Sequence, residues 1–452
     1  MSDEKYEFKG ATKTKLVILA VVGVLLFAIG VFLAMRTGHE EHEPAGKVSV
    51  EVTKNLVATS EAAAVSEGHA EGEHSETAPW IKRIFASLWM NNIFFTGIGI
   101  IGLFFIAIQY AAQAGWSTPI RRIPLAIGNW IPYAGILMLV SWFIVKHDVF
   151  HWTHADLYRP LAEGGDKVIQ GKSGLWYWPM DPTKGDTWPI FYIARMVIFF
   201  GLWYLFFVWI RKEILTQDED GSVEHWYNAR KLSAIFLIIF AVSSSMAAWD
   251  WVMSIDPHWY STMTGWYVFA SWWVTGLAAI TLIVISLKSA GYLKMVNSNH
   301  LHDLGKFCFA FSIFWTYIWF SQFLLIYYAN IPEESIYFIE RLKNPPYSWI
   351  FYANLFLNFV FPFLLLMTRD AKRQSSMLKV VCPIIIVGHW FDFYNMVTPG
   401  VLQEQGGVGF LEIGMTLIFA AGFLFVVLSS LAKAPLVAKH DPLMEESLHH
   451  HI

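Results

Sequence analysis

Charge is scarce in this chain of 452 residues. Asp, Glu, Lys and Arg together make up 15% of it, against about 25% in an ordinary soluble domain. Hydrophobic residues make up 55% and aromatic residues 17%. The net charge of −4 says little, because the distribution of the charges matters more than their sum. No nucleic-acid partner is expected. This composition excludes an ordinary soluble domain and predicts a polytopic membrane protein whose surroundings are lipid.

Cysteine is almost absent, because the chain holds only Cys308 and Cys382, both within apolar runs. Two cysteines are too few for a disulfide framework, a Cys-rich zinc site or an iron–sulfur cluster. The sequence also lacks the C-x-x-C-H motif of covalent haem attachment and any Gly-rich loop for phosphates or dinucleotides. We therefore expect the chain to bind no cofactor and no metal of its own.

Long apolar runs dominate what is present. A spanning helix needs about 20 apolar residues, and ten runs approach that length. The first exceeds the apolar core of a signal peptide, which is about 7–15 residues long, and is interpreted as an anchor. The ten runs are 16–35, 93–113, 124–145, 189–210, 232–253, 263–287, 305–329, 349–367, 378–397 and 411–431.

The basic residues predict how these spans are oriented. Lys and Arg gather in the amino-terminal segment, in alternate connections and in the tail, and they mark the cytoplasmic side. The connections 254–262 and 398–410 on the opposite side contain neither residue. We expect a multi-pass protein of the bacterial inner (cytoplasmic) membrane with both termini cytoplasmic.

The non-membrane stretches complete the predicted division of the chain. The Glu- and His-rich stretch that includes HEEHE at 39–43 indicates a mobile periplasmic linker, since it has little to bury. The predicted parts are an amino-terminal segment with the first span (1–35), the linker (36–88), a first four-helix bundle with a long periplasmic loop at 146–188 (89–262), a second four-helix bundle (263–400), and the last span with the cytoplasmic tail (401–452).

A short internal repeat suggests the architecture. WDWVMSIDP at 249–257 is similar to FDFYNMVTP at 391–399, and IFYIA at 190–194 is similar to IFYAN at 350–354. Looking for such self-similarity is an early step in reading a chain. The copies lie four spans apart, so they share one orientation. The sequence therefore predicts an all-α fold of ten transmembrane helices, with two parallel-repeated four-helix bundles and two flanking helices.

Five ionisable residues fall inside or at the ends of predicted spans: Arg195, Asp250, His389, Asp392 and Glu412. Such residues cost several kcal/mol in lipid and usually face protein or water. By the predicted orientation all five belong to the outer part of the membrane. His389 and Asp392 are three residues apart and share a helix face.

Two interpretations of this cluster stay open. Arg195, Asp250, His389 and Asp392 are candidates for proton transfer or for a quinone pocket, because carboxylates in a low-dielectric setting can pass protons. Alternatively, Arg195 and Asp250 form a structural ion pair between helices.

Other polar residues of the spans and their ends are secondary candidates. Asp256 precedes a proline and is expected to cap a turn. His258 is expected at the membrane interface, and Glu412 opens the last span. Further candidates for an inner relay, or for ordinary packing, are Ser243, Ser244, Ser245, Tyr317 and Gln322. The only candidate partners of His389 for a b-type haem are His147 and His151, which lie at a span end, so such a haem is not expected.

Two segments carry a family resemblance: WDWVMSIDPHWYSTMTGWYVFA at 249–270 and HDLGKFCFAFSIFWTYIWFSQFLLIYYANIPEE at 302–334. They resemble the ActF-type membrane subunit of bacterial alternative complex III, which is a quinol:cytochrome c (or high-potential iron–sulfur protein) oxidoreductase. That subunit belongs with the NrfD-like, or polysulfide-reductase-type, membrane proteins. The resemblance covers nearly the whole chain, and these two segments are its specific part.

The resemblance implies partners and a role. The partners would be a second NrfD-like membrane subunit, a periplasmic iron–sulfur subunit, pentahaem and monohaem cytochrome c subunits, and in some cases a terminal oxidase. The complex would hold haem c and iron–sulfur clusters and would oxidise menaquinol or ubiquinol. This chain would contribute scaffold and a proton-transfer path, with a quinone pocket as a further option. The alternatives are a pure scaffold and an independent ion or solute transporter, which inverted repeats and broken helices would favour.

Overall fold

The computed structural model describes residues 4–40 and 77–451, and every named element in these two ranges is helical. Ten of the described helices are long and apolar enough to cross a membrane. They coincide with the ten apolar runs of the sequence, so the prediction of an all-α multi-pass membrane protein is confirmed.

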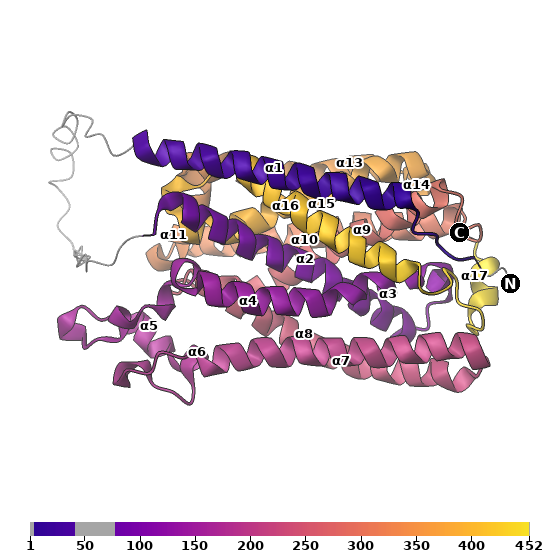
Figure 1. Ribbon diagram of the computed structural model, residues 1–452, viewed down its shortest axis with the longest axis horizontal. Coiled ribbons are helices and arrows are strands. Elements are labelled where there is room, and N and C mark those ends of the chain that lie inside the picture. The colour runs from indigo at the N-terminus through magenta and orange to yellow at the C-terminus, as the bar shows by residue number, and fades with distance from the viewer. Residues whose placement is uncertain (1–3, 41–76, 452) are drawn as a thin grey trace.

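Ten spans account for most of the chain (Figure 1). They are α1 (Gly10–Glu40), α2 (Pro79–Ala111), α3 to α4 (Arg122–Ile127 and Ile131–Val149), α7 (Ile190–Asp220), α8 (Val223–Trp251), α9 (Met263–Ser289), α10 (Ser298–Ala329), α12 to α13 (Pro345–Leu355 and Phe361–Leu365), α15 (Ser375–Leu402) and α16 (Phe410–Leu431). The shorter helices are α5 (Lys167–Lys172), α6 (Gly174–Tyr177), α11 (Pro332–Lys343), α14 (Arg369–Arg373) and α17 (Met444–Leu448).

The helices on both sides of the predicted linker 36–88 extend into it, so the segment between them is shorter than predicted. α1 continues to Glu40, and α2 begins at Pro79, where a proline at the first helical position suits a helix start. Apolar content alone placed these boundaries too far into the membrane, because helices extend beyond the hydrocarbon layer. The rest of the linker, 41–76, lies outside the described residues.

α2 is the central helix, and its glycines explain how it is surrounded. Of its most apolar stretch 94% is buried, against 17% for α1. A Cβ atom on Gly97 would lie 1.8 Å from the Trp272 ring, and one on Gly102 would lie 2.5 Å from the Pro124 carbonyl oxygen. Glycine at these positions lets neighbouring helices approach the α2 backbone closely, as is common in membrane helix packing.

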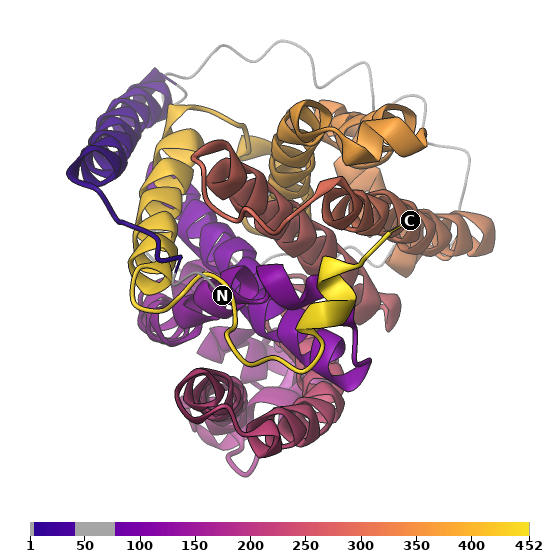
Figure 2. The same cartoon turned by 90° about the vertical axis from the view of Figure 1, so that its right-hand side faces the viewer.

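The spans around α2 pack as two groups (Figure 2). α4, α7 and α8 form a first bundle with α2, whereas α9, α10, α12 to α13 and α15 pack as a second bundle. α8 and α9 join the bundles, and α2 also packs on α9 and α15. α1 lies at the edge against α16. That a sequence repeat relates the two bundles stays a prediction.

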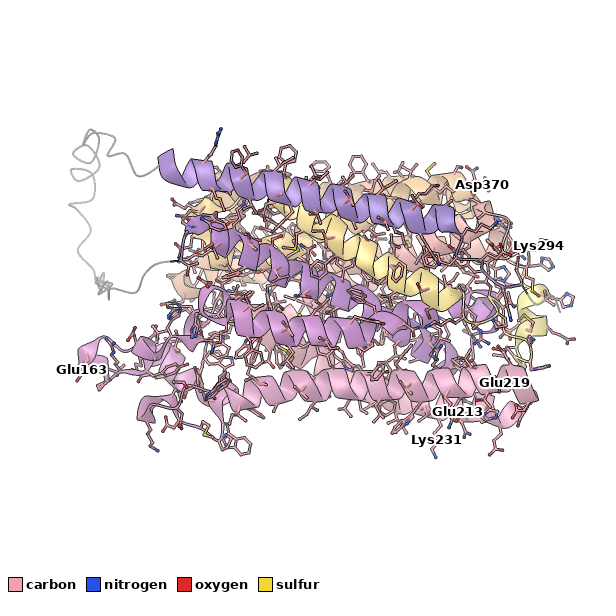
Figure 3. All side chains as sticks on the ribbon, in the orientation of Figure 1. Glu163, Glu213, Glu219, Lys231, Lys294 and Asp370 are labelled. Carbon is pink, nitrogen blue, oxygen red and sulfur yellow. The ribbon has the colours of Figure 1, made fainter. Side chains whose placement is uncertain are left out.

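The two ends of the molecule differ (Figure 1). The 146–188 loop with α5 and α6 lies at one end, together with α11, and we call this the outer end. Both chain termini lie at the opposite, inner end, where the Leu436 amide donates to the Glu4 carbonyl at 2.9 Å. Figure 3 shows Glu163 at the outer end, and Glu213 and Lys294 among the charged side chains of the inner end. That the inner end is cytoplasmic stays a prediction.

A π-helical turn interrupts the eighth span at Phe356–Val360, directly before Pro362. Proline lacks the N–H that an α-helix requires, and such turns often occur at functional sites. The turn follows Asn354 and contains Asn358, whose amide donates to the Asn354 side-chain oxygen at 3.3 Å. These two amides face the interior of the second bundle, where both are fully buried.

Candidate functional site

The acidic segment 249–259 is bonded to three different parts of the molecule. Asp250 binds Arg195 of α7, Asp256 contacts Arg341 of α11, and His258 contacts the 146–188 loop. Its polar residues therefore do not form one site. They hold the outer ends of separate elements together.

Arg195 and Asp250 form a forked ion pair. Arg195 Nε donates to Asp250 Oδ2 and its Nη2 donates to Oδ1, both at 2.7 Å. The same Nη2 also donates to the Leu175 carbonyl of α6 at 2.6 Å, and the guanidinium carbon lies 4.3 Å from the centre of the Phe191 ring. The side chains of Arg195 and Asp250 are 8% and 10% exposed. A planar guanidinium paired in this way fixes the carboxylate strongly, which favours the structural interpretation of this pair.

Asp392 of α15 has very different neighbours, all of them neutral donors. Its Oδ1 accepts from the Tyr267 hydroxyl, in a short contact, and from the Asn354 amide at 3.0 Å. Its Oδ2 accepts from the Ser271 hydroxyl at 2.6 Å and from the Trp315 indole N–H at 2.9 Å. Donors from three helices of the second bundle, α9, α10 and α12, thus meet at one carboxyl group of α15 that is fully buried.

His389 lies one turn before Asp392 on the same helix. Its Nδ1 is 3.6 Å from Asp392 Oδ2, and its ring meets the Trp315 ring edge to face at 5.3 Å between centres. Within the described residues neither ring nitrogen has a hydrogen-bond partner, although the side chain is fully buried. Most buried polar groups are hydrogen-bonded, so this imidazole beside a carboxyl group is a candidate for exchanging a proton with it or for binding water.

Counting lone pairs shows what this arrangement can do. Each carboxylate oxygen has two lone pairs, and here each oxygen accepts two hydrogen bonds. The contacts therefore suit an ionised Asp392, and a cationic His389 would balance its charge. Two of the four donors are hydroxyls, which can reverse their role and accept from a protonated carboxyl group. The pair can hold one proton on either residue.

The depth of this site follows from its place on α15. Asp392 lies ten residues before the helix end at Leu402, which is about 15 Å along a helix. Asp392 is 17 residues from the other helix end at Ser375, so the site lies inside the span and nearer to its outer end.

The four predicted site residues thus form two pairs rather than one cluster. Arg195 is bonded to Asp250, and His389 lies beside Asp392, but no hydrogen bond or ion pair joins the two pairs within the described residues. Their similar sequence contexts gave no sign of this separation.

Arg341 is the partner that sequence reasoning missed at Asp256. Its Nη2 donates to Asp256 Oδ2 at 3.3 Å and its Nε donates to the Asn395 carbonyl at 2.9 Å. The guanidinium also lies 3.3 Å from the centre of the Tyr337 ring and is only 2% exposed. We expected the Asp256 side chain to cap a turn. Among the described residues it bonds this arginine instead. No pattern in the sequence marks Arg341, because it lies in α11, outside the predicted spans.

His258 fastens the outer loop to the same segment. Its Nε2 lies 2.6 Å from Asp166 Oδ2, and the Lys172 ammonium donates to the Pro257 carbonyl at 2.5 Å. Burial raises the pKa of Asp166, but hydrogen bonds from the Ile169 N–H and from His258 outweigh it, so the net shift is downward. The predicted interface position of His258 is consistent with its half-exposed side chain.

Glu412 is bonded at the start of α16. Its Oε1 accepts from Arg83 Nε at 2.6 Å, and its Oε2 accepts from Arg83 Nη2 at 3.0 Å and from the Gly409 N–H at 2.7 Å. Arg83 also lines a cavity of about 1100 Å³ at the outer end, between α1, α2, α11, α12 and the end of α15. Tyr347 lines this cavity too, and its buried hydroxyl has no partner within the described residues.

The predicted relay residues differ in position. Ser243 accepts from the Trp203 indole at 2.9 Å, and Gln322 donates to Ser261 at 3.1 Å. Ser245 bonds the Ala241 carbonyl of its own helix. The side chain of Tyr317 is 67% exposed on the outside of α10. Tyr317 therefore faces away from the bundle interior, where a relay would have to lie.

Tyr267, Ser271 and Trp315 are further site residues that the sequence did not single out. The spacing of Tyr267 and Ser271 places both on one helix face, and this was the only available signal. Aromatic and hydroxyl residues are frequent in membrane helices, so the spacing alone does not distinguish a site from packing.

Comparisons with known proteins do not identify a family. No protein-family model matches the chain, and no curated protein matches it significantly.

Proposed function

We propose that this chain is a cofactor-free integral membrane subunit of a respiratory quinol:cytochrome c (or high-potential iron–sulfur protein) oxidoreductase. It contributes scaffold and a proton-transfer site at Asp392 and His389. The similarity of segments 249–270 and 302–334 to the ActF-type subunit supports the assignment to such a complex. Ten spans with few charges support a membrane subunit.

The observation that carries the proton-transfer part is the environment of Asp392. The carboxyl group is fully buried, all its hydrogen-bond donors are neutral, and an unpartnered histidine lies 3.6 Å away. Burying a charge without a fixed counter-ion is costly, so the charge of this pair depends on where its proton lies. A pair with two accessible protonation states is what general acid–base chemistry and proton relays require.

The assignment to a complex is tested by gentle detergent extraction of the native protein. Mass spectrometry and a reduced-minus-oxidised haem spectrum should show c-type haem, a second NrfD-like subunit and an iron–sulfur protein in the same particle. A chain that purifies alone and without colour would overturn the assignment and make the transporter alternative the one to test.

The proton-transfer role is tested in the intact complex with Asp392→Asn. The variant should assemble but lose most quinol oxidation or its proton yield, because asparagine cannot hold the proton. Normal turnover with normal proton yield would leave only the scaffold role. Asp250→Asn is the matched comparison in the first bundle, where a structural pair should affect assembly or stability more than turnover.

The cavity at the outer end favours a second candidate, a quinone pocket. Its volume is just above the usual range for small-molecule sites, which is about 300–1,000 Å³. The Asn344 amide at this cavity could bond a quinone carbonyl, and the quinone would supply the two-electron chemistry. A photoreactive quinone that labels this cavity, and fails to label an Asn344→Ala variant, would support the pocket.

A further inference from the structure

Ser271 has one hydroxyl hydrogen but two acceptors. Its Oγ lies 2.6 Å from Asp392 Oδ2 and 3.1 Å from the Tyr267 carbonyl oxygen, one turn earlier on α9. The Trp315 indole N–H points at both Ser271 Oγ, at 3.0 Å, and Asp392 Oδ2, at 2.9 Å. A hydroxyl has one donor and two lone pairs, so Ser271 can serve only one of its acceptors at a time.

The two oxygens of Asp392 therefore differ. At Oδ1, the Asn354 amide can only donate, and within the described residues the Tyr267 hydroxyl has no acceptor besides this oxygen. A proton on Oδ1 would leave the Tyr267 hydroxyl without an acceptor. At Oδ2, both donors have an alternative, since Ser271 can bond the Tyr267 carbonyl and Trp315 can bond Ser271. Only Oδ2 can accept a proton without leaving a buried group unpaired, which would cost about 1–3 kcal/mol.

We propose that Ser271 is a positioning residue that lets Asp392 take up its proton at Oδ2 from His389 Nδ1. The inference rests on the proposed proton-transfer function and specifies its geometry. In the step the Nδ1–H bond of His389 breaks and an O–H bond forms at Oδ2. His389 becomes neutral and Asp392 becomes a neutral acid. The Ser271 hydroxyl turns from Oδ2 to the Tyr267 carbonyl, and its oxygen accepts from the new acid.

The surroundings leave few other groups that could take this role. The titratable side chain of α9 that contacts Asp392 is Tyr267, and α15 itself supplies His389. On α11, Arg341 is bonded to Asp256 and to the Asn395 carbonyl, the Tyr337 ring lies against its guanidinium, and Glu340 is 3.9 Å from it. The side chains that α10 and α12 direct at the carboxyl group, Trp315 and Asn354, are not titratable.

The experiment is infrared difference spectroscopy on the full-length protein in lipid nanodiscs, in H₂O and D₂O. The carbonyl stretch of a protonated Asp392 is assigned by its disappearance in Asp392→Asn. In the parent this band should appear as the pH is lowered, because the pair then takes up a proton from water through His389, and it should exchange readily with deuterium.

Three variants distinguish the proposed turning of the Ser271 hydroxyl, which we call the switch, from a packing role of Ser271. Ser271→Ala should slow the exchange about tenfold and displace the pH dependence of the band by about one pH unit, since one unit is about a tenfold change in the equilibrium. Ser271→Thr keeps a hydroxyl and should retain the parent behaviour. Ser286→Ala removes an exposed hydroxyl of the same helix that bonds its own backbone, so it should change neither quantity.

A Ser271→Ala protein with the exchange rate and pH dependence of the parent would overturn the proposal. If that variant does not fold, Ser271→Cys takes its place, since a thiol is a weaker donor and should give an intermediate displacement. These results are independent of complex assembly. Native extraction without partner subunits would sink the proposed complex, whereas a fully active complex with an unchanged band in Ser271→Ala would sink only the proposed role of Ser271.

Discussion

Asp250 and Asp392 occupy matching places in the similar segments WDWVMSIDP and FDFYNMVTP, yet their neighbours differ. Asp250 is bonded at both oxygens to the Arg195 guanidinium, whereas Asp392 is bonded only to neutral donors. The position that corresponds to Arg195, directly after IFYAN, is Leu355. The second bundle therefore lacks the cation that fixes the charge in the first.

The difference shows how one motif can serve structure in one place and chemistry in another. A carboxylate held by a permanent cation keeps a constant charge and ties two helices together. A carboxyl group among neutral hydroxyls, beside a histidine, can change its charge because its surroundings can rearrange. The π-helical turn of the second bundle lies beside this site, and its Asn358 amide donates to the side-chain oxygen of Asn354.

The largest effect is expected at the ion pair of Arg195 and Asp250 in the first bundle. Asp250→Ala should destabilise the protein by about 3–5 kcal/mol, because it leaves Arg195 buried without a counter-charge. The double variant Arg195→Met with Asp250→Leu should recover most of that loss. Thermal unfolding in detergent measures both. A double variant as unstable as the single one would show that the pair contributes more than charge compensation.

Asp392→Asn tests the second bundle, where we expect a smaller loss of stability but a large loss of function. Turnover of the complex should fall about a hundredfold, within the usual range for loss of a general acid–base group. Stability should fall by about 1–3 kcal/mol, since the amide N–H₂ would meet two donors. Quinol oxidation assays and unfolding curves of the same preparation give the two numbers. A variant that loses stability only would make both bundles structural.

Gly388→Ala in α15 tests how tightly the second bundle packs beside the site. Its new Cβ would lie 2.2 Å from the Asn358 side-chain oxygen, so the methyl group must displace an amide beside the site. We expect a cost of about 1–3 kcal/mol, as for other overpacked positions. Gly201→Ala in α7 of the first bundle is the control, because nothing lies within 4 Å of its added Cβ. Equal melting temperatures for the two variants would contradict the expected asymmetry.

The smallest expected effect concerns the contact between Asp166 and His258, which connects the 146–188 loop to segment 249–259. Because folding lowers the pKa of Asp166, its contribution is present above the unfolded pKa, near 4, and is lost as the pH falls through the folded value. This contact is partly exposed and should contribute less than about 1 kcal/mol to the free energy of unfolding. Hydrogen exchange of residues 166–172 should be faster in Asp166→Asn than in the parent near pH 6, and the gap should narrow as the pH falls toward 3. A difference in exchange rate that does not change with pH would show that titration of Asp166 does not cause it.

Much of the fold was predictable because lipid restricts the choice. Backbone groups cannot stay unpaired in a bilayer, so apolar runs of the right length must become helices. The ends of α1 and α2 were less predictable, since helices continue into polar regions that hydropathy does not mark. The site was predicted in part, because charges within spans are rare enough to stand out.

The sequence by itself determined ten membrane-spanning helices and the identity of the few buried charges, since both follow from composition and local pattern. Only the tertiary structure decided which charge meets which partner. Arg195 reaches Asp250 because α7 and α8 pack together, and Asp392 meets Tyr267, Ser271, Trp315 and Asn354 because four helices converge there. The chemistry of a buried carboxyl group depends on neighbours within a few ångströms, and those neighbours are brought together from distant parts of the chain.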